Sequence, residues 1–341
     1  MGLPGLVWSN GTLVWIHDAE QDANFRRALI ATKEGLHEAI GFPIRMCNEF
    51  LGVMEFFSRE IHPPDNELIA MMTSIGIQIS QFIERRQAQK ELRSQEENRR
   101  IAREIQQGLL PKTMPTLSGF TICGRSSFAD EVGGDCFDFI PASVGGREYL
   151  DVLIADASGH GIGAALLMAE TQAYLRALAL TCANVETLLA LTNRRLAEDL
   201  KTPHFVTLLL MQLDPTNRSL LYAHAGHCPG YVLNHLGRTK AVLTGLDLPL
   251  GVMSSSQFST GPTIPLESGD LVFLFTDGII EAQSSDDNHF GMERALDLVR
   301  RHQQESPDEI LEALFGAVSD FSGHRLQDDL TAVIIKVEGA G

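Results

Sequence analysis

Apolar and polar positions divide the chain into three stretches of different periodicity. Residues 1–60 contain short apolar runs that we interpret as strands, among them "GLVW" and "TLVWI" on either side of the turn "SNG". Two longer runs, "IGFPIRM" and "EFLGVMEFF", are separated by "CNE", a pattern typical of a β-hairpin. The segment "HPPDNE" (62–67) interrupts this pattern and offers Asp65 as the N-cap of a following helix.

The second stretch is helical from about Leu68 to about Leu110. Ile75, Ile79 and Phe82 recur at three- and four-residue steps and mark one apolar face. The following "ERRQAQKELRSQEENRRIAREIQQ" consists almost entirely of helix-forming residues and contains no glycine or proline. Proline in "GLLPKTMP" then ends the helix, because it cannot continue the hydrogen-bond ladder.

The charged part of this helix permits two interpretations. One is a single solvated helix, and the other is a parallel coiled coil that joins two domains in a homodimer. Arg86 and Gln89 interrupt the heptad pattern, whereas Ile101, Ile105 and Leu109 restore an apolar face near the end. The apolar patches on both sides favour the coiled coil, and with it a homodimer through this helix.

The third stretch, about 112–341, alternates strand-like runs with helical patterns. Several runs follow one another across short turns such as "DPTNR" (214–218) and "GHCPG" (226–230), which implies antiparallel pairing. Runs as apolar as "EYLDVLIADA" and "FVTLLLMQLD" are expected to be covered on both faces. The pattern predicts an α+β fold, a layered sandwich with antiparallel sheets inside and helices outside.

The composition of the chain argues against some classes of binding partner. The formal net charge of −17 argues against nucleic acid, since binding of a phosphate backbone needs clustered lysine and arginine. The five cysteines are widely separated and form no C-x-x-C pair, so we expect reduced thiols in a cytoplasmic protein rather than disulfides or structural zinc. No signal peptide is visible and the longest apolar runs are too short for a bilayer, so no membrane partner is expected.

Aspartates stand at the ends of four buried strands. Asp135 follows the glycine pair of "VGGDCFDF", Asp156 and Asp277 end "LIAD" and "LVFLFTD", and Asp328 and Asp329 precede "LTAVII". A single aspartate in such a place is usually a helix cap or turn former. Strand ends of one sheet can meet, however, and clustered carboxylates repel one another unless cations lie between them. Such oxygen ligands suit Mg²⁺ or Mn²⁺, and two such ions suggest hydrolysis of a phosphoester.

Histidines in two motifs remain ambiguous. His160 in "SGHG" either protonates a leaving oxygen or has only a local structural role. This motif is not a G-x-S-x-G elbow, so Ser158 is expected in the turn rather than as a nucleophile. His224 and His227 in "HAGHCPGY" lack an accompanying cysteine pair or third histidine, which favours a turn between paired strands over a zinc site.

The motifs "VGGDCFDF", "IADASGHGIGAALLMA", "LLYAHAGHCPGYVL", "LFTDGIIEA" and "DDLTAVIIK" occur in this order along the chain. In this the chain resembles SpoIIE/RsbU-like phosphatases, which belong to the metal-dependent (PPM) serine/threonine phosphatase superfamily, over about residues 100–338. The resemblance implies an α-β-β-α sandwich and a site with two Mn²⁺ or Mg²⁺ ions. By motif position, it implies as metal ligands Asp135, Asp156, Asp277, Asp328 and the backbone carbonyl of Ala157.

Four residues are candidates for accessory roles. Asp138 matches the second acid of the family's "GGDxxD", and Asp329 stands where the wider superfamily often has asparagine. His160 lies two residues beyond the histidine of the eukaryotic-type "DGHG" motif. Gly278, which follows Asp277, permits close approach of the backbone to the site.

The N-terminal region, residues 1–85, resembles the C-terminal half of a GAF sensor domain along the segment from "LVWSNG" to "QFIERR". The family architecture implies a helical linker over 86–112 and a phosphatase domain over 113–341. It also implies that the linker end, "RRIAREIQQGLLP", forms a switch helix that adjusts the metal site. The apolar face of Ile101, Ile105 and Leu109 is the expected contact.

Three functions are compatible with these patterns. The first is a metal-dependent phosphoserine or phosphothreonine protein phosphatase, for which the family suggests a phosphorylated STAS-type anti-anti-sigma protein as substrate. The second is a catalytically inactive interaction module of the same fold. The third is a nucleotidyl cyclase, because "GGDCF" echoes a GGDEF signature, although the other aspartate motifs have no place in that interpretation.

Overall fold

The computed structural model describes residues 2–19, 21–22, 25, 28–46, 49–63, 65–144, 146–182, 184–200 and 204–339. The chain divides into two units, 1–97 and 98–341, which are described separately. The predicted linker 86–112 is not a body of its own. It coincides with the second half of one helix, α3 (Asn66–Leu109), and the division between the units falls within that helix.

The second unit contains two five-stranded antiparallel sheets. One has the strand order β10-β9-β12-β13-β4, and the other has the order β11-β8-β7-β6-β5. The strands are β4 (Phe120–Ser127), β5 (Asp135–Val144), β6 (Arg147–Ala157), β7 (Val206–Asp214), β8 (Ser219–Ala225), β9 (Gly230–Leu233), β10 (Thr239–Leu243), β11 (Ile264–Pro265), β12 (Leu271–Phe275) and β13 (Leu330–Val337).

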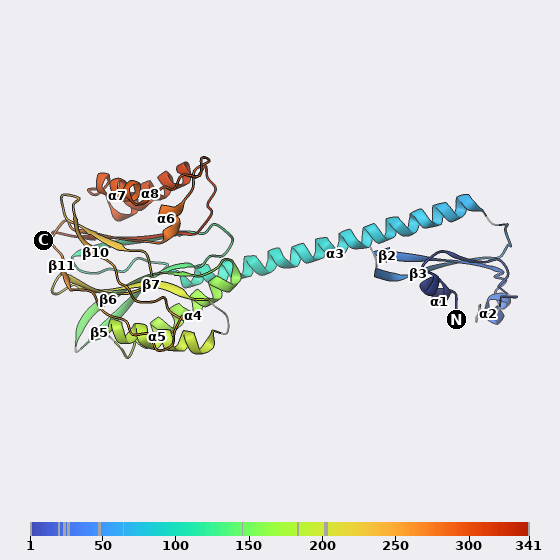
Figure 1. Ribbon diagram of the computed structural model, residues 1–341, viewed down its shortest axis with the longest axis horizontal. Coiled ribbons are helices and arrows are strands. Elements are labelled where there is room, and N and C mark those ends of the chain that lie inside the picture. The colour runs from blue at the N-terminus through green and yellow to red at the C-terminus, as the bar shows by residue number, and fades with distance from the viewer. Residues whose placement is uncertain are drawn as a thin grey trace. The chain divides into compact units, whose positions relative to one another are not determined.

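Helices cover the outer face of each sheet (Figure 1). The helices α4 (Ile162–Ala179) and α5 (Val185–Asp199) pack on the sheet of β5 to β8. The helices α7 (Met292–Arg301) and α8 (Pro307–Phe321), with the short α6 (Asp277–Glu281), pack on the sheet of β12 and β13. This arrangement confirms the predicted α-β-β-α sandwich.

The apolar character of β6 follows from its place between two cores. Val152 and Ile154 belong to the core between the sheets, whereas Leu153 and Ala155 belong to the core under α4 and α5. Successive side chains of a strand point to opposite faces, so a strand covered on both sides reads as a continuous apolar run. A polar residue inside such a strand has a side-chain partner, as Asp151 has in Gln212 of β7, whereas Asp156 stands near the strand end.

The first unit contains the antiparallel sheet β1-β2-β3, formed by β1 (Val14–Ile16), β2 (Glu38–Met46) and β3 (Glu49–Ser58), with α2 (Ala28–Lys33) between the first two strands. The predicted hairpin is therefore confirmed as β2 and β3. Likeness of this unit to a GAF domain stays a prediction.

The strand predicted at "GLVW" is wrong, because Leu3–Asn10 form the helix α1. Proline stands in its first turn, where the missing N–H is not needed, and Gly11 ends it in the left-handed conformation at φ 68°. Leu3 and Val7 lie one turn apart and are buried against β2. A Cβ on Gly41 would lie 2.8 Å from Val7 Cγ2, so the absence of a side chain there lets the helix dock.

Helix α3 begins as predicted, since Asp65 Oδ1 accepts hydrogen bonds from the N–H of Glu67 (2.8 Å) and of Leu68 (3.3 Å). Its end near Leu110 also agrees with the sequence pattern.

The predicted apolar face of α3 in the first unit is only partly right. Phe82 is 60% exposed, whereas Gly76 and Ser80 are buried against β2. Ser80 Oγ accepts a hydrogen bond from Arg45 N at 3.0 Å, and a Cβ on Gly76 would lie 3.1 Å from the Phe42 ring. Close packing of helix on strand selects these small residues over the larger apolar ones.

Two further expectations from the sequence concern the state of the cysteines and the absence of a membrane-spanning helix. Cys123, Cys136, Cys182 and Cys228 are free thiols, and Cys47 lies outside the described residues. Among the helices that the structure describes, none combines the length and apolar character needed to cross a bilayer.

Candidate functional site

The first two aspartates meet across a strand pair. Asp135 opens β5 and Asp156 stands near the end of β6, and the antiparallel register places them directly opposite each other. Gly134 directly precedes Asp135. A Cβ on Gly134 would lie 2.7 Å from the backbone oxygen of Ala157 and 3.2 Å from Asp156 Oδ1. The glycine thus leaves a space bounded by a carbonyl and a carboxylate.

The remaining aspartates come from the other sheet. β12 ends at Phe275 and is followed by Asp277, the first residue of α6, while Asp328 and Asp329 lead into β13. Since β12 and β13 are antiparallel neighbours, these segments meet at the same edge. We call Asp135, Asp156, Asp277, Asp328 and Asp329 the aspartate cluster.

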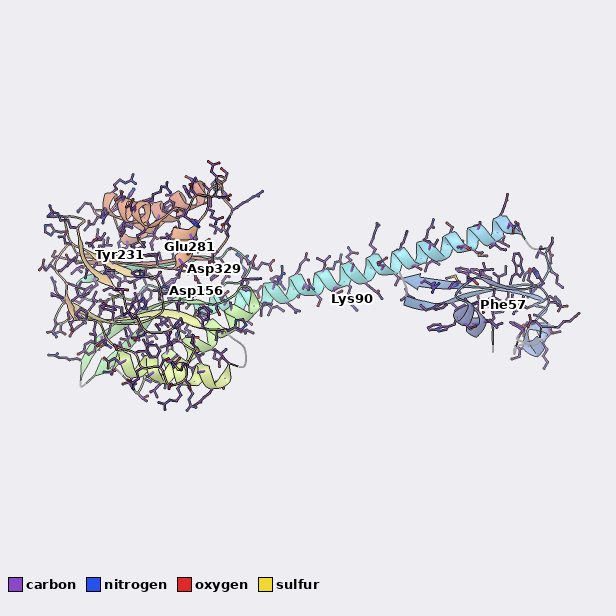
Figure 2. The ribbon with its side chains drawn as sticks, viewed as in Figure 1. Phe57, Lys90, Asp156, Tyr231, Glu281 and Asp329 are labelled. Atoms are coloured by element: carbon purple, nitrogen blue, oxygen red, sulfur yellow. The ribbon has the colours of Figure 1, made fainter. Side chains whose placement is uncertain are left out.

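A cavity of about 320 Å³ opens at the aspartate cluster. Asp156, Asp328 and Asp329 line it, together with the glycine-rich loop 132–134 and the turn 159–161. Figure 2 shows Asp156 and Asp329 close together between the two sheets. Residues nearly two hundred positions apart in the chain thus share one polar cleft.

A hydrogen bond ties the two sheets together beneath this cleft. Thr276 Oγ1 donates to Asp135 Oδ2 at 2.6 Å, and both side chains are buried. Thr276 Oγ1 also accepts from the N–H of Thr331 in β13 at 3.0 Å. Sequence reasoning missed Thr276, although its place between a buried strand and Asp277 was the available signal.

Burial and mutual repulsion raise the pKa values of Asp135, Asp156, Asp277 and Asp329. Burial, followed by the charges of Asp277, Asp328 and Asp329, raises the pKa of Asp156 to about 7. Burial and the Asp156 charge raise the pKa of Asp135 well above its ordinary value, against the lowering effect of the Thr276 hydroxyl. Burial is also the first cause of the raised pKa values of Asp277 and Asp329. Four carboxylates are therefore held where their charges are unfavourable.

Asp329 organises the loop beside the cleft. It is buried, and its Oδ1 accepts a hydrogen bond from the N–H of Ala129 at 2.9 Å. Its neighbour Asp328 is exposed, and Asp328 Oδ1 accepts from the Asp329 N–H at 2.8 Å. The two adjacent acids thus differ, with one holding the loop and the other facing solvent.

Asp138 lies outside the cleft, on the opposite face of β5 from Asp135. Arg176 of α4 donates to it from Nε (2.5 Å) and from Nη2 (2.9 Å), and Gln172 Nε2 donates at 2.8 Å. Gln172 Nε2 and Arg176 Nη2 also donate to the backbone oxygen of Leu109 (3.0 and 3.3 Å). Asp138 therefore fixes the end of α3 to α4.

The buried face of α3 in the second unit differs from the predicted one. Ile101 and Ile105 are 44% and 62% exposed, and only Leu109 of the predicted trio is partly buried. Gln106 is buried instead. Its Nε2 donates to the backbone oxygen of Gly133 at 2.6 Å, and its Oε1 accepts from the Gly133 N–H at 3.1 Å. One amide thus satisfies both backbone groups of a buried glycine, which an isoleucine cannot do.

The ambiguous histidines occupy different places. His160 is exposed and lines the cavity, whereas Ser158 pins its turn by accepting from the N–H of Phe205 at 2.9 Å. His227 is buried, pairs with Thr207 Oγ1 at 2.8 Å and reaches the Phe275 backbone oxygen at 3.1 Å. It therefore braces the loop between β8 and β9. The predicted turn between paired strands is wrong, because β8 and β9 belong to different sheets and this loop crosses from one sheet to the other.

The cleft has the composition of a divalent cation site. In the chain as far as the structure describes it, no three histidine, cysteine, aspartate or glutamate side chains already stand close enough to hold a metal ion. The donors nevertheless fit, because they are carboxylate and carbonyl oxygens around a space kept open by Gly134, and their pKa values are raised by one another's charge. A bound cation relieves that repulsion.

Comparisons with known proteins agree with this geometry. The family described as Stage II sporulation protein E (SpoIIE) matches residues 146–338. The phosphoserine phosphatase RsbU of Bacillus subtilis is 27% identical over 271 residues, which are 79% of this chain and 78% of that protein.

Two solved structures share the fold. The SiaA-PP2C domain of Pseudomonas aeruginosa superimposes with a TM-score of 0.61 at 23% identity, covering 73% of this chain and 98% of that one. The PP2C phosphatase domain of SpoIIE from Bacillus subtilis, with a fragment of its regulatory domain, gives a TM-score of 0.56 at 20% identity, covering 65% and 64%.

Proposed function

Because the chain belongs to the SpoIIE family of PP2C-type serine/threonine phosphatases, we propose that its aspartate cluster binds divalent cations and hydrolyses phosphoserine or phosphothreonine in a protein. The observation that supports the proposal is that Asp156, Asp328 and Asp329 line one cleft, with Asp135 directly opposite Asp156 and with Asp277 near enough for its charge to raise the pKa of Asp156. Two Mn²⁺ or Mg²⁺ ions are the proposed cofactors.

Each residue has a proposed part. Asp135, Asp156, Asp277 and Asp328 hold the cations, together with the backbone oxygen of Ala157. When bound, the cations supply a nucleophilic water at neutral pH and neutralise the charge of the phosphate oxygens. Thr276 orients Asp135, Asp329 holds the loop 129–135, and Gly278 admits the backbone of Asp329. His160 is exposed at the cavity, where it can protonate the leaving oxygen.

The proposed substrate is a phosphorylated STAS-type regulator, as the family resemblance suggests. A protein substrate agrees with the exposure of Asp328 and His160 at this cleft. The proposal also includes a cytoplasmic location, with which the four free cysteines of the described chain agree. The predicted homodimer through α3 belongs here as well, and the exposed Phe82, Leu92 and Ile101 are its candidate contacts.

The alternatives have less support. The cyclase hypothesis rests on "GGDCF" alone, and here Gly133 serves the contact with Gln106 while Asp135 bonds Thr276. An inactive module would not need a cluster in which burial and neighbouring charges raise the pKa values of four carboxylates, since such an arrangement is unfavourable without cations.

The test is hydrolysis of p-nitrophenyl phosphate and of a phosphoserine peptide by the full chain with Mn²⁺, with Mg²⁺ and with a chelator. We expect phosphate release that depends on the cation, and none with the chelator. Incubation with GTP and Mg²⁺ should yield no cyclic product. Absence of phosphatase activity with every cation, in folded protein, would contradict the proposal.

Regulation is proposed to act through Gln106. Replacing Gln106 with leucine leaves the buried N–H and oxygen of Gly133 without partners, which costs about 1–3 kcal/mol for each group. The loop carrying Asp135 should shift, so we expect kcat to fall about tenfold and the Mn²⁺ requirement to rise. Kinetics at varied Mn²⁺ concentration measure both quantities.

Ile105→Ala is the matched control for Gln106→Leu. Ile105 neighbours Gln106 on the same helix but is 62% exposed, so its loss should leave kcat and the Mn²⁺ requirement unchanged. If folded Gln106→Leu matches the wild type while Ile105→Ala is impaired, the originally predicted apolar face is the regulatory one.

A further inference from the structure

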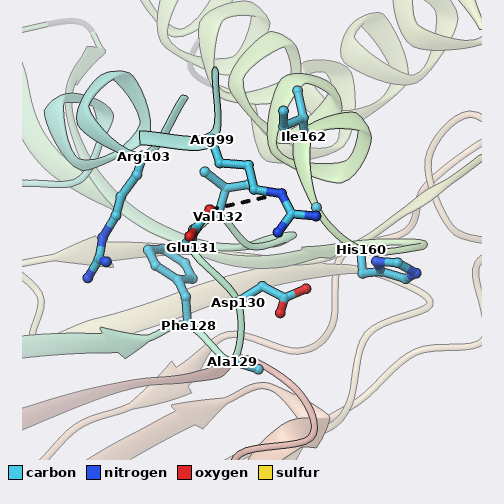
Figure 3. A pocket seen from close by; sticks show the side chains of 10 residues that line it. Arg99, Arg103, Phe128, Ala129, Asp130, Glu131, Val132, His160 and Ile162 are labelled. Carbon is cyan, nitrogen blue, oxygen red and sulfur yellow. Dashed lines mark ion pairs between the residues drawn. The ribbon is translucent and has the colours of Figure 1, made fainter. Parts of the chain in front are cut away.

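A second cavity adjoins the candidate site (Figure 3). It has a volume of about 700 Å³ and lies between α3, the loop 128–132 and the turn 160–162. Its wall is shared with the smaller cavity, because the same residues line both: Ala129, Asp130, Val132, His160 and Gly161. A group bound in the larger cavity is therefore the immediate neighbour of a group bound at the aspartate cluster.

Arginine supplies the positive charge of this second cavity. Arg99 and Arg103 stand one helical turn apart on α3 and both line it. Arg99 Nε lies 4.0 Å from Glu131 Oε2, and both side chains are largely solvated, so this ion pair is weak. Within the part of the chain that the structure describes, Arg103 makes no ion pair. It therefore has no carboxylate of the described residues within ion-pair distance, although Asp130 and Glu131 line the same cavity.

The two acids that line the cavity, Asp130 and Glu131, form no ion pair with Arg103. Glu131 is the partner of Arg99, and Asp130 stands on the wall shared with the smaller cavity. Because no carboxylate of the described chain pairs with Arg103, its guanidinium can form a charge-assisted hydrogen bond with an external anionic group, against the overall negative charge of the protein.

Apart from these charged residues and His160, the lining is apolar. Val132 is buried, Phe128 is partly buried, and Ile162 is 39% exposed at the start of α4. A guanidinium beside an apolar wall suits a peptide that carries an acidic and an apolar side chain, and suits a free phosphate ion less well.

The two cavities also differ in the charge of the residues that line only one of them. Asp156, Asp328 and Asp329 line only the smaller cavity, and Arg99 and Arg103 line only the larger one. A phosphate held at the cluster therefore leaves the arginines to the neighbouring part of the substrate.

We propose that the larger cavity docks the substrate segment next to the phosphoserine or phosphothreonine, and that Arg103 pairs with an aspartate or glutamate of that segment. This inference rests on the proposed phosphatase function. Arg103 is then a specificity-determining residue, and the preferred substrate is a phosphoprotein with an acidic residue near the phosphorylated one.

The test uses synthetic phosphoserine peptides of neutral sequence, each with one glutamate at a different distance on either side of the phosphoserine. A parallel set carries lysine. The full chain with Mn²⁺ should show a kcat/KM about tenfold higher for glutamate at a preferred position than for the neutral peptide. In Arg103→Ala this ratio should fall to about one, and in Arg103→Glu the preference should shift to lysine.

Arg100→Ala is the matched control, because Arg100 lies on the same helix, pairs with Glu104 at 3.4 Å and does not line the cavity. It should keep the wild-type preference. A wild-type enzyme that cleaves all peptides at one rate would overturn the docking proposal alone, and failure to cleave any would overturn the phosphatase function beneath it. An equal loss on neutral and acidic peptides in Arg103→Ala would place Arg103 at the phosphate and contradict docking.

Discussion

Replacing Asp156 with asparagine is expected to lower kcat for phosphoserine hydrolysis about a thousandfold. At the same time it should make the cation-free protein more stable at neutral pH. The loss of rate corresponds to about 4 kcal/mol of transition-state stabilisation, the magnitude expected when a cation ligand is lost. Stability should rise because the folded protein no longer has to hold that charge among Asp277, Asp328 and Asp329.

The sign of the pH dependence follows from the pKa of Asp156, which folding raises from 3.8 to about 7. Below the lower value the carboxyl is protonated in both states, and its ionisation costs nothing. Between the two values the unfolded chain ionises first, so the free energy of unfolding falls as the pH rises. Above about pH 7 the cost is complete.

Thermal melts of wild type and Asp156→Asn in chelator, between about pH 5 and about pH 8, measure this effect. The variant should melt higher than the wild type by a margin that grows with pH, and added Mn²⁺ should raise the melting temperature of the wild type only. Asp151→Asn is the control for the loss of kcat and of the Mn²⁺ response, since Asp151 is a buried aspartate of the same strand that bonds Gln212 away from the site, and it should keep both. Burial raises the pKa of Asp151 to about 6, so the stability gain of this variant should level off near pH 6, whereas that of Asp156→Asn should grow up to about pH 7. Wild-type kcat in Asp156→Asn would exclude this residue as a cation ligand.

Replacing Gly278 with alanine is expected to lower kcat about a hundredfold. The added Cβ would overlap the backbone oxygen of Asp329 and lie 3.4 Å from the Cβ of Asp328. Since Asp329 leads into β13, which is paired on both sides, the acids rather than the sheet must move. A displacement of about 1 Å at a catalytic centre can cost a factor of about 10².

Gly316→Ala separates this steric effect from helix propensity. Both glycines are helical, and alanine favours a helix by about 1 kcal/mol relative to glycine. At Gly316 of α8 a Cβ has no neighbour within 4 Å, so that variant should gain stability and keep wild-type kcat. A folded Gly278→Ala with unchanged kcat and Mn²⁺ requirement would show that the neighbouring acids tolerate displacement.

The convergence of acids at strand ends could be predicted in part, because a buried strand leaves few places for a charge without a partner. In a sandwich whose strands are covered on both faces, a carboxylate is tolerated at the strand ends, and there Asp135, Asp156 and Asp277 lie. Their meeting depends on register, which the sequence pattern does not specify. Asp138 lies outside the cleft because it is three positions after Asp135 in β5, and side chains an odd number of positions apart point to opposite faces of a strand.

The faces of helices were harder to predict than their existence. Two neighbouring faces of α3 could be buried, and they are displaced by one residue: one carries Ile101 and Ile105, and the other carries Ala102 and Gln106. Hydrophobicity alone predicts that the first is buried. The second is buried because Gly133 needs partners for its N–H and oxygen. That requirement belongs to a loop distant in sequence, so periodicity within the helix cannot reveal it.

The strand predicted from the short apolar run "GLVW" was wrong for a related reason. Four residues such as "GLVW" are compatible with a strand or with one turn of a helix, and hydrophobic pattern alone does not separate them. The proline in the first turn and the glycine after the last one were the better signals, because they match the preferred ends of a helix.

The bond from Thr276 to Asp135 joins the two sheets at an edge where the other nearby groups are like charges. When the cation is scarce, the repulsion between these charges should therefore weaken the contact between the two sheets at this edge, and turnover should stop. Local opening there exposes backbone to proteases, and the time a protein survives in a cell depends on how often it opens. A cell short of the ion would lose the enzyme itself, so its abundance as well as its rate would follow metal supply.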